Sequence, residues 1–254
     1  MRSSLSALYS AAVYLLFLAV FTYAILFVEG IVVPKTIDSG PAGDLVSTFL
    51  INSALLGVFA LQHTIMARPG FKNWWTKIIP PEIERSTFVL FATAALALLV
   101  WQWRPAPQLI WSVDDPVLAG AIIAVSWGGW ALLLASTCLI SHFHLFGLSQ
   151  GFARLMGIKA EDGPFVTPLF YRWVRHPLYL GFVIAFWAAP QMSLGHLFFA
   201  IATTGYILIG IWFEERDLVA VFGDRYRQYS REVGMLLPKL RAPGQAAKRR
   251  PHVS

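Results

Sequence analysis

The densest group of side chains able to do chemistry is the stretch Arg172-Trp-Val-Arg175-His176-Pro177-Leu-Tyr179-Leu-Gly181. If this stretch is helical, its two arginines, the histidine and the tyrosine lie three or four residues apart and share a face. Pro177 removes one backbone donor and disturbs the turn before it, and Gly181 leaves room for a ligand or a neighbouring helix. A structural interpretation is also open, with arginines that reach the headgroups, a kinking proline and an interfacial tyrosine.

A second charged stretch, Glu214-Glu215-Arg216-Asp217, ends a long apolar run and is followed by Phe222, Gly223, Tyr226 and Tyr229. Two adjacent carboxylates at a membrane boundary are costly unless they are solvated or paired. We expect Arg172 and Arg175 as their partners, because the two ends of a helical hairpin lie close together. The aromatic residues predict a short helix that folds back over this pair, or else an amphipathic helix in the interface.

The elements that must position these stretches are apolar. Hydrophobic residues make up 57% of 254 positions and charged residues 13%, against roughly a quarter charged in ordinary globular proteins. A helix needs about 20 apolar residues to cross a bilayer. Five or six segments meet this length: 7–33, 45–65, 86–103 and 117–140, then a hairpin of 170–189 and 193–213. Because these runs are continuous they exclude a β-barrel, and the sequence predicts an all-α, polytopic membrane bundle.

Basic residues are distributed unevenly between the two ends of these spans. With the amino terminus inside, all but two of the 20 Lys and Arg fall on cytoplasmic segments, the exceptions being Lys35 and Arg104. The positive-inside rule explains this asymmetry without any binding of nucleic acid. Residues 1–241 are predicted to form one membrane domain, and 242–254 a basic, disordered tail that touches anionic lipid headgroups. The single cysteine, Cys138, allows no disulfide framework.

The two charged stretches, in this order and at this separation, resemble the membrane methyltransferases of the isoprenylcysteine carboxyl methyltransferase and phospholipid methyltransferase superfamily. The amino-terminal half, with Gln62-His63, Trp74-Trp75, Glu84-Arg85 and His142-Phe-His144, is similar to the bacterial methanethiol S-methyltransferases, which are grouped with the NnrU-like proteins. The resemblance covers most of the chain. It implies a cytoplasm-facing pocket for S-adenosylmethionine at about 162–238, with cofactor-binding residues His176, Tyr179, Gly181, Arg175, Glu214, Glu215 and Tyr226.

The chemistry of these side chains agrees with such a methyl donor. S-adenosylmethionine carries a sulfonium, an ammonium, a carboxylate and an adenine. Glu214 or Glu215 can meet the ammonium or the ribose hydroxyls, while Arg175 or His176 can pair with the carboxylate. Interfacial aromatic residues can hold the adenine and face the sulfonium. No Gly-x-Gly-x-x-Gly motif follows a strand, which argues against a soluble dinucleotide-type fold.

Three histidines lie at the predicted cytoplasmic ends of the second and fourth spans: His63, His142 and His144. They could ligate a metal, but no cysteine or carboxylate set accompanies them and the resembling families use none, so no metal is expected. One of them could instead take the proton of a thiol, helped by the positive field of Arg175. We expect His144 or His142 in this role. Polar residues that face headgroups are the structural alternative.

The sequence therefore predicts an S-adenosylmethionine-dependent methyltransferase that converts a small thiol, methanethiol, to dimethyl sulfide. We expect it in the bacterial inner membrane, with its site facing the cytoplasm and Trp127, Trp130 and Phe143 on the apolar side of the pocket. Two alternatives stay open: a methyltransferase acting on a prenylated cysteine or a phospholipid, and a non-enzymatic NnrU-like membrane protein. The near absence of charge within the first four spans argues against an ion path. The oligomeric state stays open.

Overall fold

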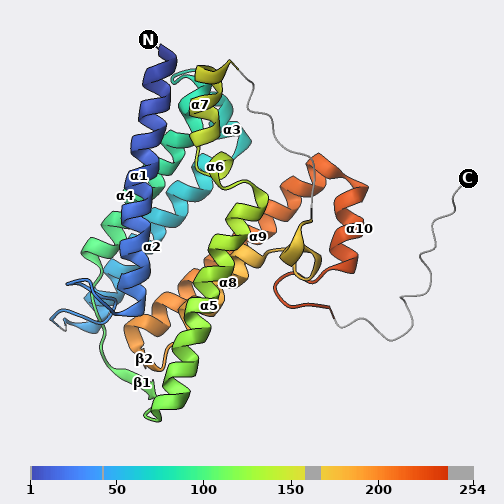
Figure 1. Cartoon of the computed structure of the whole chain (residues 1–254). Coiled ribbons are helices and arrows are strands. Elements are labelled where there is room, and N and C mark those ends of the chain that lie inside the picture. The colour runs from blue at the N-terminus through green and yellow to red at the C-terminus, as the bar shows by residue number, and fades with distance from the viewer. Residues whose placement is uncertain (1, 42, 158–166, 240–254) are drawn as a thin grey trace, which may run out of the picture.

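The computed structural model describes residues 2–41, 43–157 and 167–239. Within these ranges, five helices are long and apolar enough to cross a membrane. They are α1 (Arg2–Glu29), α2 (Leu45–Ala67), α4 (Pro81–Gln102), α5 (Pro116–Ile140) and α9 (Leu194–Phe222). A helix satisfies its backbone hydrogen bonds internally, as a segment in contact with lipid must. The predicted all-α, polytopic membrane bundle is confirmed (Figure 1).

The predicted hairpin of 170–189 and 193–213 differs from the structure. Its first arm is α-helical only in α8 (Pro177–Trp187), and these 11 residues are about half the length that a bilayer crossing needs. Pro177 takes the first helical position, where its missing N–H is tolerated. The second arm, α9, continues past the predicted end at 213 to Phe222. Glu214 and Glu215 therefore lie inside a long helix and not after it.

Helices α5 and α8 cross closely through facing glycines. A Cβ added to Gly129 would lie 2.7 Å from the Gly181 carbonyl oxygen, and a Cβ on Gly181 would lie 2.6 Å from the Gly129 carbonyl oxygen. Real Cβ atoms do not approach backbone this closely, so only glycine allows the crossing. Of the two uses predicted for Gly181, the approach of a neighbouring helix is the one seen here.

A second close contact joins α1, α4 and α7 (Leu148–Met156). Ser86 Oγ donates to Ser10 Oγ at 2.8 Å, and both serines are fully buried. A Cβ on Gly151 of α7 would lie 2.2 Å from the same Ser10 Oγ. Small residues at such contacts are typical of helix pairs in membranes, and here they seat α7 directly on α1.

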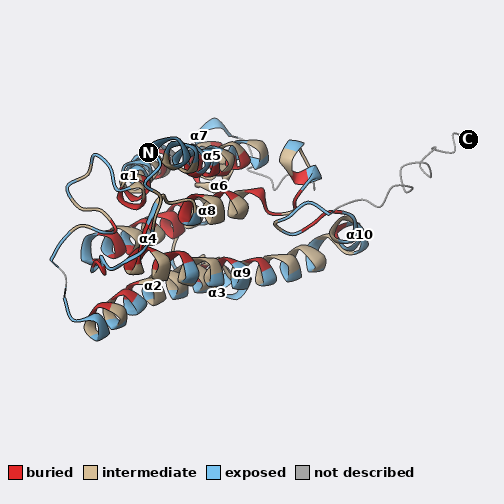
Figure 2. Cartoon of the chain, turned by 90° about the horizontal axis from the view of Figure 1, so that it is seen from below, coloured by how far each residue is buried: buried red, intermediate tan, exposed pale blue. Residues whose placement is uncertain are grey.

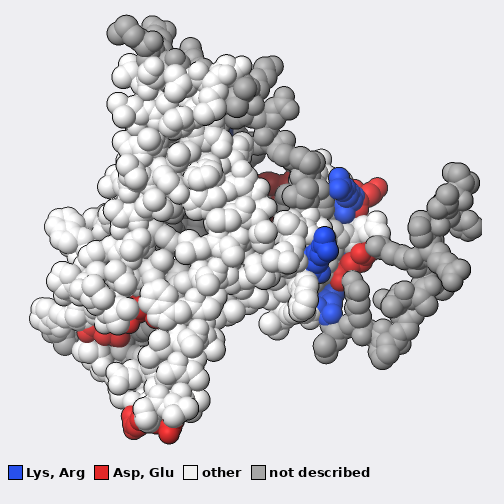
Figure 3. Space-filling model, in the orientation of Figure 1, with Lys and Arg blue, Asp and Glu red and all other residues white. Residues whose placement is uncertain are grey.

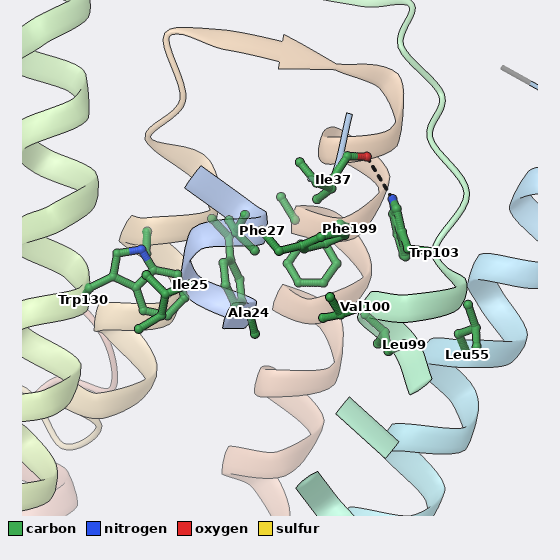
Figure 4. Close-up of a cluster of buried hydrophobic side chains, with 14 of the residues drawn as sticks. Ala24, Ile25, Phe27, Ile37, Leu55, Leu99, Val100, Trp103, Trp130 and Phe199 are labelled. Atoms are coloured by element: carbon green, nitrogen blue, oxygen red, sulfur yellow. Dashed lines mark hydrogen bonds between the residues drawn. The ribbon is translucent and has the colours of Figure 1, made fainter. Parts of the chain in front are cut away.

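The main buried cluster lies where α1, α2, α4, α5, α8 and α9 meet, and Figure 4 shows part of it. Trp103 is only 1% exposed, and its indole N–H donates to the Ile37 carbonyl oxygen at 3.1 Å. Buried positions lie on the helix faces that turn toward other helices, and exposed positions lie on the outer faces (Figure 2). The core therefore holds the long helices together independently of the charged stretches.

Short elements close the two ends of the bundle (Figure 1). At one end, called the strand end here, β1 (Leu109–Ser112) pairs antiparallel with β2 (Gln191–Ser193) and ties two connections together. The other, the short-helix end, carries α3 (Pro69–Trp75), α6 (His142–Leu145), α7, the 3-10 helix η1 (Leu169–Arg172) and α10 (Asp224–Glu232). Both charged stretches of the sequence meet at the short-helix end. The predicted tail at 242–254, and residue 162 where the predicted cofactor part begins, lie outside the described residues.

Candidate active site

The predicted shared helical face from Arg172 to Tyr179 is wrong. Residues 173–176 are not helical, and α8 starts only at Pro177. A proline disfavours the helical conformation in the residue before it, and His176 accordingly has φ −126° and ψ 63°. Arg175 and His176 thus enter the site from a non-helical segment, Tyr179 enters it from the first turn of α8, and Arg172 is exposed at the end of η1.

Residues that follow α10 hold this non-helical segment in place. Val174 forms a parallel bridge with Gly234. The Arg175 N–H donates to the Gly234 carbonyl oxygen at 2.8 Å, and the His176 N–H donates to the Met235 carbonyl oxygen at 3.1 Å. The two charged stretches are therefore joined by backbone as well as by side chains.

Three side chains, Arg175, His176 and Glu215, form a group that we call the Glu215 cluster. Glu215 Oε1 accepts from Arg175 Nε at 2.7 Å and from the His176 ring at Nε2 at 3.0 Å. His176 is 4% exposed and the Glu215 side chain 25%. Glu214 is more open, with a side chain 44% exposed and Oε2 4.0 Å from His176 Nδ1. The predicted pairing of this carboxylate stretch with Arg175 is present in the structure.

Arg175 also joins α10 to the cluster. Its Nη1 donates to the carbonyl oxygens of Ser230 at 2.9 Å and Val233 at 2.7 Å, where α10 ends. A cation is favourable at the C-terminus of a helix, because the carbonyl groups there have no partner within the helix. With three acceptors around it, this guanidinium is held in one position and fixes α10 against α9.

Tyrosines surround the two carboxylates. Tyr179 lies close enough to Glu214 for the two to interact. Tyr226 is 2% exposed, and burial, followed by the negative charge of Glu215, raises its pKa. The Tyr229 hydroxyl donates to the Tyr171 carbonyl oxygen at 2.5 Å, and burial raises the pKa of Tyr229 to about 12. These phenols are neutral at physiological pH and offer aromatic faces beside acidic groups.

A second attachment of α9 was not foreseen from the sequence. Arg68, just after α2, pairs with Asp217 at 3.2 Å and lies 4.8 Å over the Phe213 ring. About two turns before Phe213 on the same helix, the Tyr206 hydroxyl lies 3.3 Å from Thr64 Oγ1 of α2. The sequence predicts only that Arg68 and Asp217 lie on the same, cytoplasmic side of the membrane, and it does not predict that they pair. These contacts attach α9 to α2, while Glu215 of the same helix contacts Arg175 and His176.

The three candidate histidines have different surroundings. His63 stacks on Phe59, contacts Phe88, and has a buried Nδ1 without a partner among the described residues. His142 has one ring nitrogen 2.8 Å from the Tyr14 hydroxyl and the other 2.8 Å from Thr137 Oγ1, and burial lowers its pKa. His144 lines a polar cavity beside Arg85. The described residues contain no group of three or more His, Cys, Asp or Glu placed to hold a metal ion.

Two of the expected apolar pocket residues have other contacts. Trp130 Nε1 donates to Glu29 Oε1 at 2.7 Å, and Ser126 Oγ donates to the same oxygen at 2.7 Å. We call this group of Glu29, Ser126 and Trp130 the Glu29 clasp. Phe143 packs against Tyr14 and His142. The clasp links the end of α1 to α5, and the expected place of Trp130 on the apolar side of the cofactor pocket stays a prediction.

Several known proteins with similar sequences are methanethiol S-methyltransferases. The chain is 54% identical over 238 residues to the methanethiol S-methyltransferase of Mycobacterium tuberculosis, which covers 94% of this chain and 98% of that protein. It is 54% identical over 231 residues to methanethiol S-methyltransferase 1 of Bradyrhizobium diazoefficiens, a match that covers 91% of this chain and 81% of that protein. It is 49% identical over 233 residues to methanethiol S-methyltransferase 2 of the same organism, a match that covers 92% of this chain and 90% of that protein. No family model and no solved structure matches the chain. With such identity over nearly its whole length, this membrane protein is a methyltransferase and belongs to the methanethiol S-methyltransferase family.

Proposed function

We propose that this protein transfers a methyl group from S-adenosylmethionine to methanethiol. A bond forms between the methyl carbon and the thiol sulfur while the bond from that carbon to the sulfonium breaks, and the thiol proton is released. The products are dimethyl sulfide and S-adenosylhomocysteine. The observation that carries the proposal is the Glu215 cluster, a buried charged group at a membrane boundary in a chain of this family.

The residues around the cluster fit the charged parts of S-adenosylmethionine, which when bound supplies a methyl group activated by a positive sulfonium. The half-exposed carboxylate of Glu214 is open to an ammonium or to ribose hydroxyls. Tyr179 and Tyr226 lie beside the carboxylates, where their ring faces suit a sulfonium. Since Arg175 and His176 are occupied by Glu215 and by carbonyl oxygens, we assign them the role of orienting Glu215 and α10.

The contribution of the protein to the reaction is alignment, exclusion of water and promotion of the thiolate. Alignment of the thiol sulfur with the methyl carbon replaces a bimolecular encounter by a positioned one. The positive charge of Arg175 favours a thiolate nearby.

Catalytic roles for His144, His142 and His63 stay predictions. His144→Ala is expected to lower turnover with little change in affinity for S-adenosylmethionine, and a higher pH should recover part of the loss. Unchanged turnover in the His142/His144 double variant would leave these residues structural.

We further propose that residues 1–241 form one domain in the bacterial inner membrane, with the Glu215 cluster facing the cytoplasm. On the face shown in Figure 3, Lys and Arg gather near α10 together with Asp and Glu, whereas the strand end shows Asp and Glu without Lys or Arg. Basic residues favour the cytoplasmic side. In a Cys138→Ser background, Lys77→Cys should resist an impermeant thiol reagent applied to intact cells, and Asp114→Cys should react. The reverse pattern would contradict this orientation.

The test of the activity uses purified protein and S-adenosylmethionine labelled in its methyl group. Methanethiol, longer alkanethiols, a prenylated cysteine and phospholipid amines are offered separately, and the label is followed into volatile and lipid products. Labelled dimethyl sulfide from methanethiol is the expected result, and Glu215→Ala is expected to abolish it. Label found only in the prenylated cysteine or in lipid would replace the substrate, and no transfer to any acceptor would contradict the enzymatic proposal.

A further inference from the structure

A polar cavity of about 390 Å³ opens at the short-helix end, and its described lining includes no residue of the Glu215 cluster. Helices α3, α4, α6 and α7 surround it. The side chains that give it its chemistry are Lys72, Glu84, Arg85, His144 and Gln150. Positive, negative and neutral polar groups thus line one small cavity. Among them, only His144 has a candidate role in methyl transfer.

Two oxygen atoms in this lining lack donors. Glu84 Oε1 and Gln150 Oε1 are buried and accept no hydrogen bond from any residue that the structure describes. The amide of Gln150 is oriented by its other end, since Nε2 donates to the His144 carbonyl oxygen at 3.1 Å. A buried acceptor without a donor is destabilising. Both side chains belong to the lining of the cavity, so a ligand with positively charged N–H groups is the kind that these acceptors favour.

The same cavity carries positive charge. Lys72 lies on α3 and Arg85 on the first turns of α4. Arg85 is held in place, because its Nε donates to the Leu145 carbonyl oxygen at 2.7 Å and its guanidinium lies 4.9 Å over the Phe88 ring. An anionic group on the ligand would complement these two cations. The cavity therefore matches a ligand with both an ammonium and an anion.

A second cavity, of about 660 Å³, adjoins the first at Pro81 and is mainly apolar. Its lining comes from the beginnings of α1 and α4 and includes Leu5, Tyr9, Pro80 and Ile83. Leu5 is 62% exposed, on a helix long and apolar enough to span a membrane. An apolar groove beside a polar cavity at the end of two membrane helices is suited to a molecule with a hydrocarbon part.

We propose that the two cavities bind one phospholipid whose headgroup carries a primary ammonium. The ammonium donates to Glu84 and Gln150, the phosphate lies toward Lys72 and Arg85, and hydrocarbon follows the groove between α1 and α4. The lipid is a bound partner and not the methyl acceptor, and of the side chains named in the polar cavity only His144 is also a candidate in the methyl-transfer reaction. A trimethylated ammonium has no N–H to donate, and a glycerol headgroup has no ammonium, so both bind more weakly.

The experiment measures lipid binding to the delipidated full chain by native mass spectrometry in detergent. Phosphatidylethanolamine is titrated beside phosphatidylcholine and phosphatidylglycerol with the same acyl chains. Phosphatidylethanolamine should bind at least about tenfold more tightly, the loss expected from one charged hydrogen bond. Glu84→Gln should remove this preference, and Lys72→Gln should weaken binding of all three lipids. Asp114→Asn, which removes an exposed carboxylate at the strand end, should bind as the parent does.

Three outcomes overturn the proposal. Equal affinity for the three lipids in the parent chain, or an undiminished preference in Glu84→Gln, removes the ammonium subsite. Competition by soluble glycerophosphoethanolamine as strong as by the whole lipid removes the hydrocarbon part. Competition by S-adenosylmethionine would assign this cavity to the methyl donor, and the labelled-methyl assay, which is separate, would then decide whether the proposed function survives.

Discussion

Two carboxylates on long helices, Glu215 and Glu29, each receive two donors at one oxygen, but the donors differ in kind. Glu29 Oε1 accepts from a hydroxyl and an indole, both neutral and both on α5. Glu215 Oε1 accepts from a guanidinium and an imidazole, which lie on a non-helical segment. The geometry is similar, with distances of 2.7 Å in three of the four contacts and 3.0 Å in the last.

The difference separates structural from functional use of a carboxylate. The Glu29 clasp joins two helices through donors fixed on one rigid element, and neither donor can be exchanged for solvent without moving α5. The Glu215 cluster has the half-exposed Glu214 beside it and depends on the segment after α10 for its position. A cluster of the second kind presents the open carboxylate of Glu214 to a charged ligand, while a clasp of the first kind only joins two helices.

The largest expected effect comes from Glu215→Ala. Removal of the shared acceptor releases Arg175 and His176, and a displacement of about 1 Å in a positioned reaction costs on the order of 10²-fold in rate. Methyl transfer should fall by at least about 10²-fold, and calorimetry should show weaker binding of S-adenosylmethionine. Glu29→Gln is the matched control, and it should keep cofactor affinity while lowering thermal stability. Unchanged affinity in Glu215→Ala would mean that the cluster is another structural clasp.

Arg175→Lys tests whether the Glu215 cluster holds α10. Lysine keeps the charge but cannot reach Glu215 and the carbonyl oxygens of Ser230 and Val233 together. The loss of charged hydrogen bonds should weaken the attachment of α10 by about 1.5–3 kcal/mol. Hydrogen exchange in residues 224–235 should speed up accordingly. Arg227→Lys is the control, because its partner Asp224 is almost fully exposed, and exchange there should change little.

Gly181→Ala tests the helix crossing that positions α5, the element that carries the neutral donors. The new Cβ would lie 2.6 Å from the Gly129 carbonyl oxygen, and overpacking of this kind costs about 1–3 kcal/mol. Thermal unfolding in detergent should shift to a lower temperature. Gly205→Ala in α9, where a Cβ meets nothing within 4 Å, should leave it unchanged or raise it. Equal behaviour of the two variants would argue against a close α5–α8 crossing.

The smallest expected effect is a pH dependence of stability at the Glu215 cluster and α10, with none at the Glu29 clasp. Burial raises the pKa of Tyr229 from 10.0 to about 12, so the folded state holds this proton more tightly than the unfolded state. The resulting stability is present below pH 10 and is lost as the pH rises from 10 toward 12. Tyrosinate absorbance should report late ionisation, and Tyr229→Phe should diminish the alkaline loosening of α10. The Glu29 clasp contains no phenol and should not respond.

The apolar runs predicted the five long helices because hydrophobicity is a property of consecutive residues. They mispredicted the first arm of the hairpin, since Leu169–Arg172 forms the 3-10 helix η1, and Pro177 and the backbone hydrogen bonds to Gly234 and Met235 keep 173–176 out of a helix. The Arg175–Glu215 pair was foreseeable from two charged stretches at the ends of one hairpin. The Arg68–Asp217 pair and the Ser10–Ser86 contact were not, because residues 149 and 76 positions apart meet only through helix packing.

The bridge between Val174 and Gly234 also orders events during synthesis of the chain. A ribosome makes the chain from its amino terminus, and all five long helices precede Gly234 in the sequence. Their insertion into the membrane therefore does not need the segment that fixes Arg175 and His176. A transcript interrupted between Glu232 and Gly234 would yield a protein that inserts and accumulates normally while its charged cluster never assembles. The long helices thus determine how much protein accumulates in the membrane, and the segment after Glu232 determines whether that protein is catalytically competent.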